Sequence, residues 1–114
     1  QHLEKTVRRY LEERVSLRAL ILPVDCRREP TVLDWQLLKW CAASQLPVHV
    51  LLTKSDKLGH GKSLQALRQT RESLATMPLI SVQLFSATRN VGVTEARERI
   101  VDLLSGQGNG RKPA

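Results

Sequence analysis

Three short apolar runs constrain the fold of this chain more than any other feature of its sequence. They cover residues 17–24, 48–52 and 79–85. The first run is continuous rather than alternating, which is typical of a strand buried on both faces of a parallel sheet. Segments with helical spacing lie before, between and after the runs, over about residues 2–14, 31–46, 61–77 and 94–105. With right-handed crossovers, this αβαβαβα order predicts an α/β fold of three layers, in which parallel strands carry helices on both faces.

Capping and breaking residues mark the helix ends. Thr31 and Asp34 have the spacing of a capping pair at the start of the second helix, and Thr94 is the expected cap of the last one. Gly106 is expected to end the last helix, and the basic, glycine-rich tail 106–114 is expected to be disordered. The spacing of apolar residues predicts that one face of the last helix turns inward, through Ala96, Ile100, Leu103 and Leu104.

Composition limits the class of protein. The chain has 114 residues, of which 41% are hydrophobic and 25% are charged, as expected for one soluble globular domain. No apolar run approaches the roughly 20 residues of a membrane span, and no signal peptide is visible. Cys26 and Cys41 lack C-x-x-C spacing, which favours a reducing, cytoplasmic compartment, and Cys41 is expected in the core. Because Met does not begin the chain, we expect it to start inside a longer protein.

The net charge of +7 leaves two interpretations open. It favours an acidic partner such as RNA, DNA or anionic lipid, but solvated helix faces account for it equally well. Only four aromatic residues are present, and none is interleaved with a basic run. A base-stacking platform for nucleic acid is therefore not expected.

Two polar segments follow the second and third apolar runs. Residues 53–56 read Thr-Lys-Ser-Asp, and residues 86–87 read Ser-Ala. In an open α/β sheet both lie at the carboxyl ends of strands, where ligands bind. A carboxylate such as that of Asp56 can accept two hydrogen bonds from guanine, and a backbone N–H in a Ser-Ala loop can donate to guanine O6. Adenine has the wrong donor pattern at this edge and leaves buried polar groups unpaired.

Taken alone, this Thr-Lys-x-Asp pattern is a weak signal, because a Lys-Asp pair after a strand is often an ordinary solvated turn. Its position at the end of a buried strand, beside a second loop of the right composition, favours guanine recognition. The alternative is a non-catalytic α/β binding module with no nucleotide site.

The sequence resembles the EngB (YsxC/YihA) ribosome-assembly GTPases over about residues 1–105. The combination of segments is more specific than any one of them. The resemblance implies the C-terminal part of a P-loop GTPase domain that binds GTP or GDP, needs Mg²⁺ in the full-length protein, and acts as a switch in assembly of the large ribosomal subunit and in normal septation. The segments that carry it are residues 10–14, 25–30 and 53–58, Asp34, Trp40, residues 85–87 and Gly92.

The resemblance also implies roles for residues in the two loops. Asp56 would hold the guanine edge, and Lys54 would pack its stem over the base. Thr53 would tie this loop to a neighbouring phosphate loop. Ser86 would brace the second loop while the Ala87 N–H reads O6.

Other residues of the pattern have less defined roles. Lys57 is expected to flank the base or to remain in solvent. Asp25 and Arg27 belong to the family pattern, and we expect a structural or partner-facing role for them rather than a catalytic one. Neither a catalytic residue nor a metal ligand is predicted in this chain.

The phosphate-binding half of a GTPase has no counterpart in the sequence. Gly61-Lys62-Ser63 resembles the end of a Walker A loop, but the glycine required five residues earlier is Asp56. Residues 56–59 spell D-x-x-G, but their Asp already belongs to the base-reading loop. We therefore expect the isolated chain to bind guanine nucleotides very weakly and to hydrolyse nothing. The unpaired apolar edge of its first strand is expected to make it marginally stable or self-associating.

Overall fold

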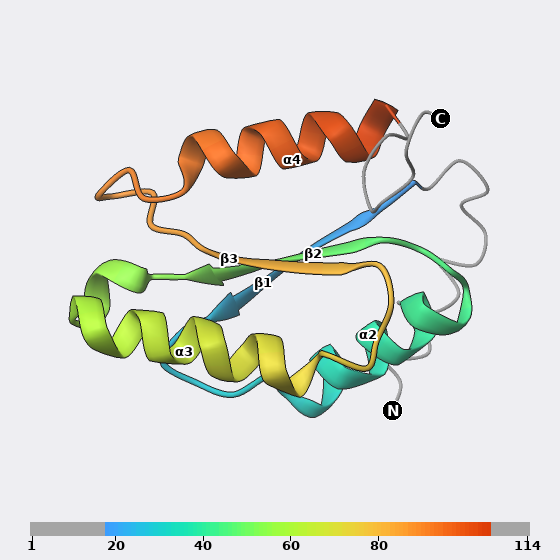
Figure 1. Cartoon of the computed structure of the whole chain (residues 1–114), viewed down its shortest axis with the longest axis horizontal. Helices are drawn as coiled ribbons and strands as arrows, with labels where there is room; N and C mark the ends of the chain where they lie inside the picture. Colours follow the sequence, from blue (N-terminus) through green and yellow to red (C-terminus); the bar gives the residue numbers. More distant parts are fainter. Residues whose placement is uncertain (1–17, 106–114) are drawn as a thin grey trace.

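A three-stranded parallel sheet forms the middle layer of the computed structural model, which describes residues 18–105 (Figure 1). Its strands are β1 (Leu20–Asp25), β2 (Val48–Thr53) and β3 (Ile80–Leu84), in the order β1-β2-β3. Both pairs are parallel, with Val48 opposite Leu20 on one side and Ile80 on the other. The predicted strands are thus confirmed. The predicted helix over residues 2–14 and the tail 106–114 lie outside the described residues.

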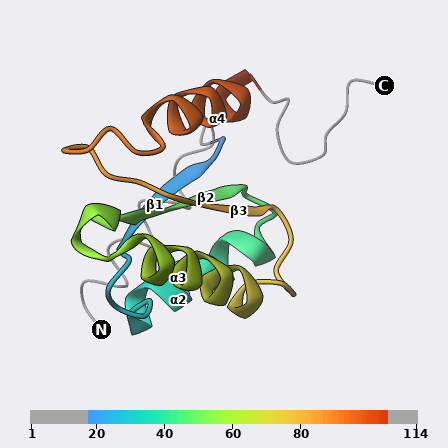
Figure 2. The same ribbon diagram turned by 60° about the vertical axis from the view of Figure 1, so that its left-hand side comes forward.

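Helices cover both faces of the sheet, as predicted. Helices α2 (Val32–Ala43) and α3 (His60–Ser73) pack on one face, and α4 (Val93–Ser105) packs on the other (Figures 1 and 2). A short 3₁₀ turn, η1 (Ser55–Lys57), connects β2 to α3. Within residues 18–105, no helix has the length and apolar character needed to cross a membrane.

The core lies between the sheet and the α2–α3 layer. Its most deeply buried side chains come from β2 and from α2, and Cys41 has no exposed surface, as predicted. Burial raises the pKa of the Cys41 thiol to about 11 because the thiolate would be poorly solvated there. Both cysteines are free thiols.

The start of α2 confirms the predicted capping pair. The Asp34 N–H donates to Thr31 Oγ1 at 3.1 Å, and the Thr31 N–H donates to Asp34 Oδ2 at 2.9 Å. Each side chain thus satisfies a backbone donor that the helix leaves without a partner.

The predictions for α4 are partly wrong. The helix begins at Val93, and the Ala96 N–H donates to the Gly92 carbonyl, so Thr94 lies inside the first turn and is not the cap. Ala96 and Leu103 are buried, but Leu104 is 61% exposed. Successive residues of a helix point about 100° apart, so only a narrow face of this helix reaches the sheet, and Leu104 lies beyond it.

The edge strand β1 differs from the long apolar edge that the sequence predicts. The Leu20 N–H donates to Pro47 and the Cys26 N–H to Thr53, so alternate residues of β1 turn toward β2 and Pro23 turns away. Because proline has no N–H, it interrupts the outward row of donors at mid-strand. Proline on an edge strand opposes pairing with another chain.

Candidate functional site

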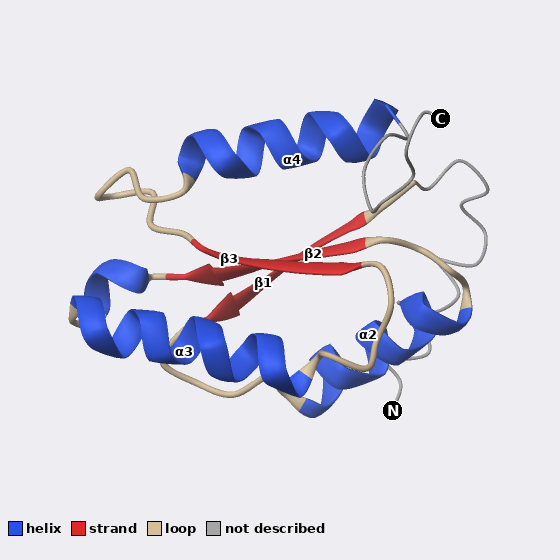
Figure 3. Ribbon diagram, in the orientation of Figure 1, coloured by secondary structure: helices blue, strands red, loops and turns tan. Residues whose placement is uncertain are grey.

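The two predicted loops meet at one end of the sheet. Figure 3 shows the segments that follow β2 and β3 leaving the sheet at the same end. Backbone pairing continues past both strands: the Phe85 N–H donates to Leu52 O at 2.9 Å, and the Ser55 N–H donates to Phe85 O at 3.1 Å. The start of η1 is therefore fixed against the segment that carries Ser86.

A hydrogen bond joins the key residues of the two loops. Ser86 Oγ donates to Asp56 Oδ1 at 2.7 Å, across thirty residues of sequence. Ser86 is buried, and its Oγ also accepts the Arg89 N–H at 3.2 Å. The Ser86 hydroxyl is the main reason why the pKa of Asp56 is lowered, because a donated hydrogen bond favours the charged carboxylate.

Lys54 stands at the turn between β2 and η1 in a left-handed conformation, with φ 61° and ψ 34°. Its side chain is exposed. Its carbonyl oxygen accepts a hydrogen bond from the Cys26 thiol at 3.4 Å, and the carbonyl of Thr53 accepts the Cys26 N–H at 3.0 Å. These two hydrogen bonds from Cys26, which directly follows β1, therefore fix the backbone at the turn that contains Lys54.

The loop that follows β3 is closed by its own backbone. Ser86 and Val91 form an antiparallel bridge, with N–O distances of 3.0 and 2.9 Å. Ala87 directly follows Ser86 and is exposed. The structure thus brings Thr53, Lys54, Asp56, Ser86 and Ala87 to one end of the sheet, as the sequence predicts, and Lys57 is exposed beside them.

Asp25 and Arg27 form a separate unit at the end of β1. The Asp25 carboxylate accepts the Arg27 N–H at 2.9 Å and two guanidinium N–H groups at 2.8 and 3.0 Å. These hydrogen bonds hold the pKa of Asp25 well below its usual range. The pair closes the turn that leaves β1. The structural or partner-facing role expected for it stays a prediction.

The segment that resembles the end of a Walker A loop is part of a helix. Gly61, Lys62 and Ser63 lie in the first turn of α3, and Ser63 Oγ donates to His60 O at 2.9 Å within it. Across residues 18–105, no group of three or more His, Cys, Asp or Glu side chains could hold a metal ion.

Sequence reasoning missed two buried polar residues, His49 near the start of β2 and Gln83 near the end of β3. They are 2% and 1% exposed, respectively, and they hydrogen-bond to each other. The signal was present, because both polar residues interrupt apolar runs. Such residues need partners when they are buried.

Comparisons with known proteins show similarity over most of the chain. No protein-family model matches it. It is 43% identical over 97 residues to the probable GTP-binding protein EngB of Thiobacillus denitrificans, covering 85% of this chain and 47% of that protein. It is 41% identical over 110 residues to the probable GTP-binding protein EngB of Herminiimonas arsenicoxydans, covering 90% and 46%.

Solved structures show the same fold. The translation elongation factor SelB of Methanococcus maripaludis, in its apo form, superposes with a TM-score of 0.75 at 20% sequence identity. The superposition covers 89% of this chain and 23% of that one. The predicted α/β fold, with a parallel sheet between two layers of helices, is confirmed.

The two sequence relatives confirm the resemblance drawn from the sequence. The chain spans about half the length of the curated relatives that it matches. Over most of its own length, it is a relative of the EngB-type GTP-binding proteins.

Proposed function

We propose that this chain forms the guanine-recognition half of a GTP-binding domain of the EngB type. The Asp56 carboxylate would accept hydrogen bonds from N1 and the 2-amino group of guanine, and the Ala87 N–H would donate to O6. Lys54 would lay its aliphatic stem along the base. Thr53 and Ser86 would hold the two loops in register.

The hydrogen bond from Ser86 to Asp56 is the observation that supports this proposal most. It fixes the carboxylate against the loop that carries Ala87. It also favours the ionised form of Asp56, and an ionised carboxylate only accepts hydrogen bonds. Guanine presents two donors at the matching edge. Adenine does not, so it would leave the carboxylate unpaired.

Phosphate binding and hydrolysis belong to residues outside this sequence. We propose that residues 1–105 form the C-terminal part of the G domain and contribute no catalytic residue and no Mg²⁺ ligand. Phosphate and Mg²⁺ contacts supply much of the affinity for GTP. They would come from the part of the domain that carries the Walker A loop and switch regions.

The biological role proposed for the intact protein is that of its family. It would act in the cytoplasm as a GTP-dependent switch in assembly of the large ribosomal subunit and in normal septation. The net charge of +7 suits a partner such as ribosomal RNA. Lys57 is exposed beside Asp56 and would flank the base or face solvent.

A chimera tests the proposed site. This chain replaces the region that it matches in the Thiobacillus denitrificans protein, so that the remainder supplies the other half of the domain. Asp56→Asn should weaken GDP binding on the order of 100-fold and strengthen binding of xanthosine diphosphate, because the amide can donate to the xanthine oxygen. The control Asp102→Asn, on the exposed face of α4, should change neither affinity. If Asp56→Asn changes neither affinity, the Thr53–Asp56 segment is an ordinary turn and the chain is a binding module without this site.

A further inference from the structure

A buried side chain beneath the second loop has no part in the site described so far. We propose that Gln83, oriented by His49, is a positioning residue that holds loop 85–92 in the geometry that reads O6 of the base. The nucleotide-binding part of its test rests on the proposed function. The hydrogen-exchange part does not.

The Gln83 amide ties together the two ends of the loop. Its Nε2 donates to Leu84 O at 3.0 Å and to Gly92 O at 2.9 Å. Leu84 is the last residue of β3, and Gly92 directly precedes α4. One buried amide thus fixes the distance between the strand that enters the loop and the helix that leaves it.

Gly92 fits closely against this amide. It has a φ of +72°, and a Cβ at this position would lie 2.6 Å from Gln83 Nε2. The loop end can approach the amide this closely only because the residue has no side chain.

His49 determines which way the amide faces. Its Nε2 lies 2.6 Å from Gln83 Oε1, which can only accept, so the proton is on Nε2. The other ring nitrogen, Nδ1, lies 2.6 Å from Ser81 Oγ. The Ser81 hydroxyl can therefore donate to Nδ1 while it accepts Arg99 Nε–H at 3.3 Å.

Burial lowers the pKa of His49, which favours the neutral ring that this pattern requires. If the Gln83 amide turned over, its oxygen would face two carbonyl oxygens and its NH₂ would face an N–H. The network therefore has one satisfactory arrangement.

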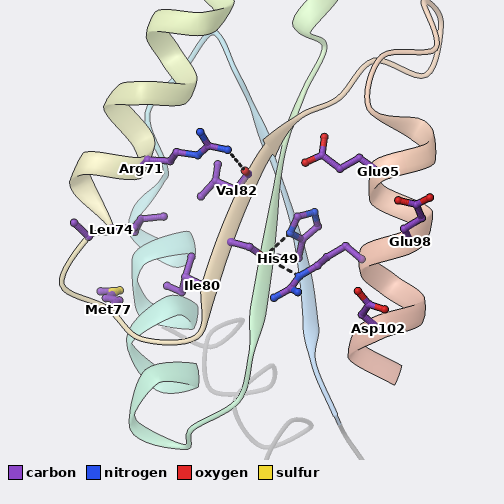
Figure 4. Close-up of a pocket in the computed structure, with 12 residues that line it drawn as sticks. His49, Arg71, Leu74, Met77, Ile80, Val82, Glu95, Glu98 and Asp102 are labelled. Carbon is purple, nitrogen blue, oxygen red and sulfur yellow. Dashed lines mark hydrogen bonds between the residues drawn. The ribbon is translucent and has the colours of Figure 1, made fainter. Parts of the chain in front are cut away.

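The outer end of the network reaches a cavity of about 670 Å³ along the free side of β3. Figure 4 shows His49 at this cavity, with Glu95, Glu98 and Asp102 of α4 on one side and Arg71 of α3 on the other. An apolar side chain at position 49 would therefore border existing space instead of a closed void.

The network acts on the site through the loop. Once Leu84 and Gly92 are fixed, the Ser86–Val91 bridge sets the path of the backbone between them. That path places Ser86 Oγ on Asp56, and Ala87 follows Ser86 directly in the chain. Without Gln83 the loop ends can separate. The Asp56 carboxylate and the Ala87 N–H, which are proposed to read the base, are then no longer held in a fixed relative position.

Hydrogen exchange in the nucleotide-free chimera tests the structural part. Gln83→Met keeps the length of the side chain and removes its polar atoms. Exchange of the Ser86 and Val91 amide protons should become about fivefold faster or more, because a neutral hydrogen bond is worth roughly this factor. The control Gln65→Met, on the exposed side of α3, should leave both rates unchanged. Unchanged rates in Gln83→Met would overturn the inference.

A base analogue separates positioning from general destabilisation. The chimera should prefer GDP over 6-thio-GDP, because sulfur is the weaker acceptor at the position that Ala87 reads. In Gln83→Met this preference should fall about threefold to tenfold, since the loop no longer holds the donor in place. The preference for GDP over inosine diphosphate, which reports on the 2-amino group and Asp56, should change less.

The double variant His49→Leu/Gln83→Met distinguishes a loss of loop positioning from a general loss of stability. Removing both partners of a buried hydrogen bond costs less stability than removing one. The double variant should recover part of the lost melting temperature while the weakened preference for O6 remains. A melting temperature that falls without any change in the two nucleotide ratios would mean a merely structural role and would overturn the inference. If the chimera binds no guanine nucleotide at all, the proposed function fails, and the exchange rates alone decide whether Gln83 positions the loop.

Discussion

Replacing Gly92 with alanine is expected to destabilise the protein, because the new Cβ would overlap Leu84 O and Gln83 Nε2. The new Cβ would lie 2.3 Å from Leu84 O and 2.6 Å from Gln83 Nε2, and the residue would keep a φ of +72°. The left-handed conformation costs alanine about 1–2 kcal/mol. The overlap adds about 1–3 kcal/mol, because a backbone carbonyl cannot rotate away as a flexible side chain would. The free energy of unfolding should therefore fall by about 2–5 kcal/mol.

Urea unfolding of the chimera measures this loss, with Gly61→Ala as the matched control. Gly61 lies in α3, and a Cβ there would meet no atom within 4 Å. The control should be neutral or more stable by about 0.5–1 kcal/mol, because alanine favours a helix over glycine. A loss below about 1 kcal/mol in Gly92→Ala, or an equal loss in both variants, would mean that the close contact of Gly92 with Leu84 O and Gln83 does not stabilise the loop.

Three further predictions concern other parts of the chain. Pro23→Val restores an outward N–H on β1 and should increase self-association in light scattering, whereas Pro78→Val, in the loop before β3, should not. Because the pKa of Asp25 is lowered in the folded state, its contribution to stability is present above about pH 4 and is lost as pH falls further. Arg27→Gln should therefore reduce the difference between the urea midpoints at pH 7 and pH 3, and Arg28→Gln should leave it unchanged. The 114-residue chain alone should not bind GDP with nanomolar or micromolar affinity in calorimetry, and such binding would contradict the proposed division of the domain.

The sequence predicted the layers and the site loops because both depend on local patterns. Apolar runs separated by helical segments define parallel strands, and polar segments at the ends of parallel strands meet at one edge of the sheet. The capping pair of Thr31 and Asp34 was equally visible, since both residues lie within one helical turn.

The predictions that failed depend on tertiary packing. The exposure of Leu104 follows from how narrow a face of α4 reaches the sheet, which helical spacing alone does not specify. The start of α4 at Val93 follows from Gly92, whose left-handed backbone lets the chain turn against Gln83. The partners of His49 and Gln83 lie on neighbouring strands, so their pairing required the register of the sheet.

The amide resonance of Ala87 reports whether this loop binds a guanine base. In a ¹⁵N-labelled chimera, addition of GDP should move the Ala87 amide proton downfield, because its N–H would donate to guanine O6. ADP at the same concentration should leave this resonance unchanged, since adenine has no acceptor at that position. Saturation of the chimera with GDP without a shift at Ala87, or an equal shift with ADP, would contradict the guanine site proposed for this chain.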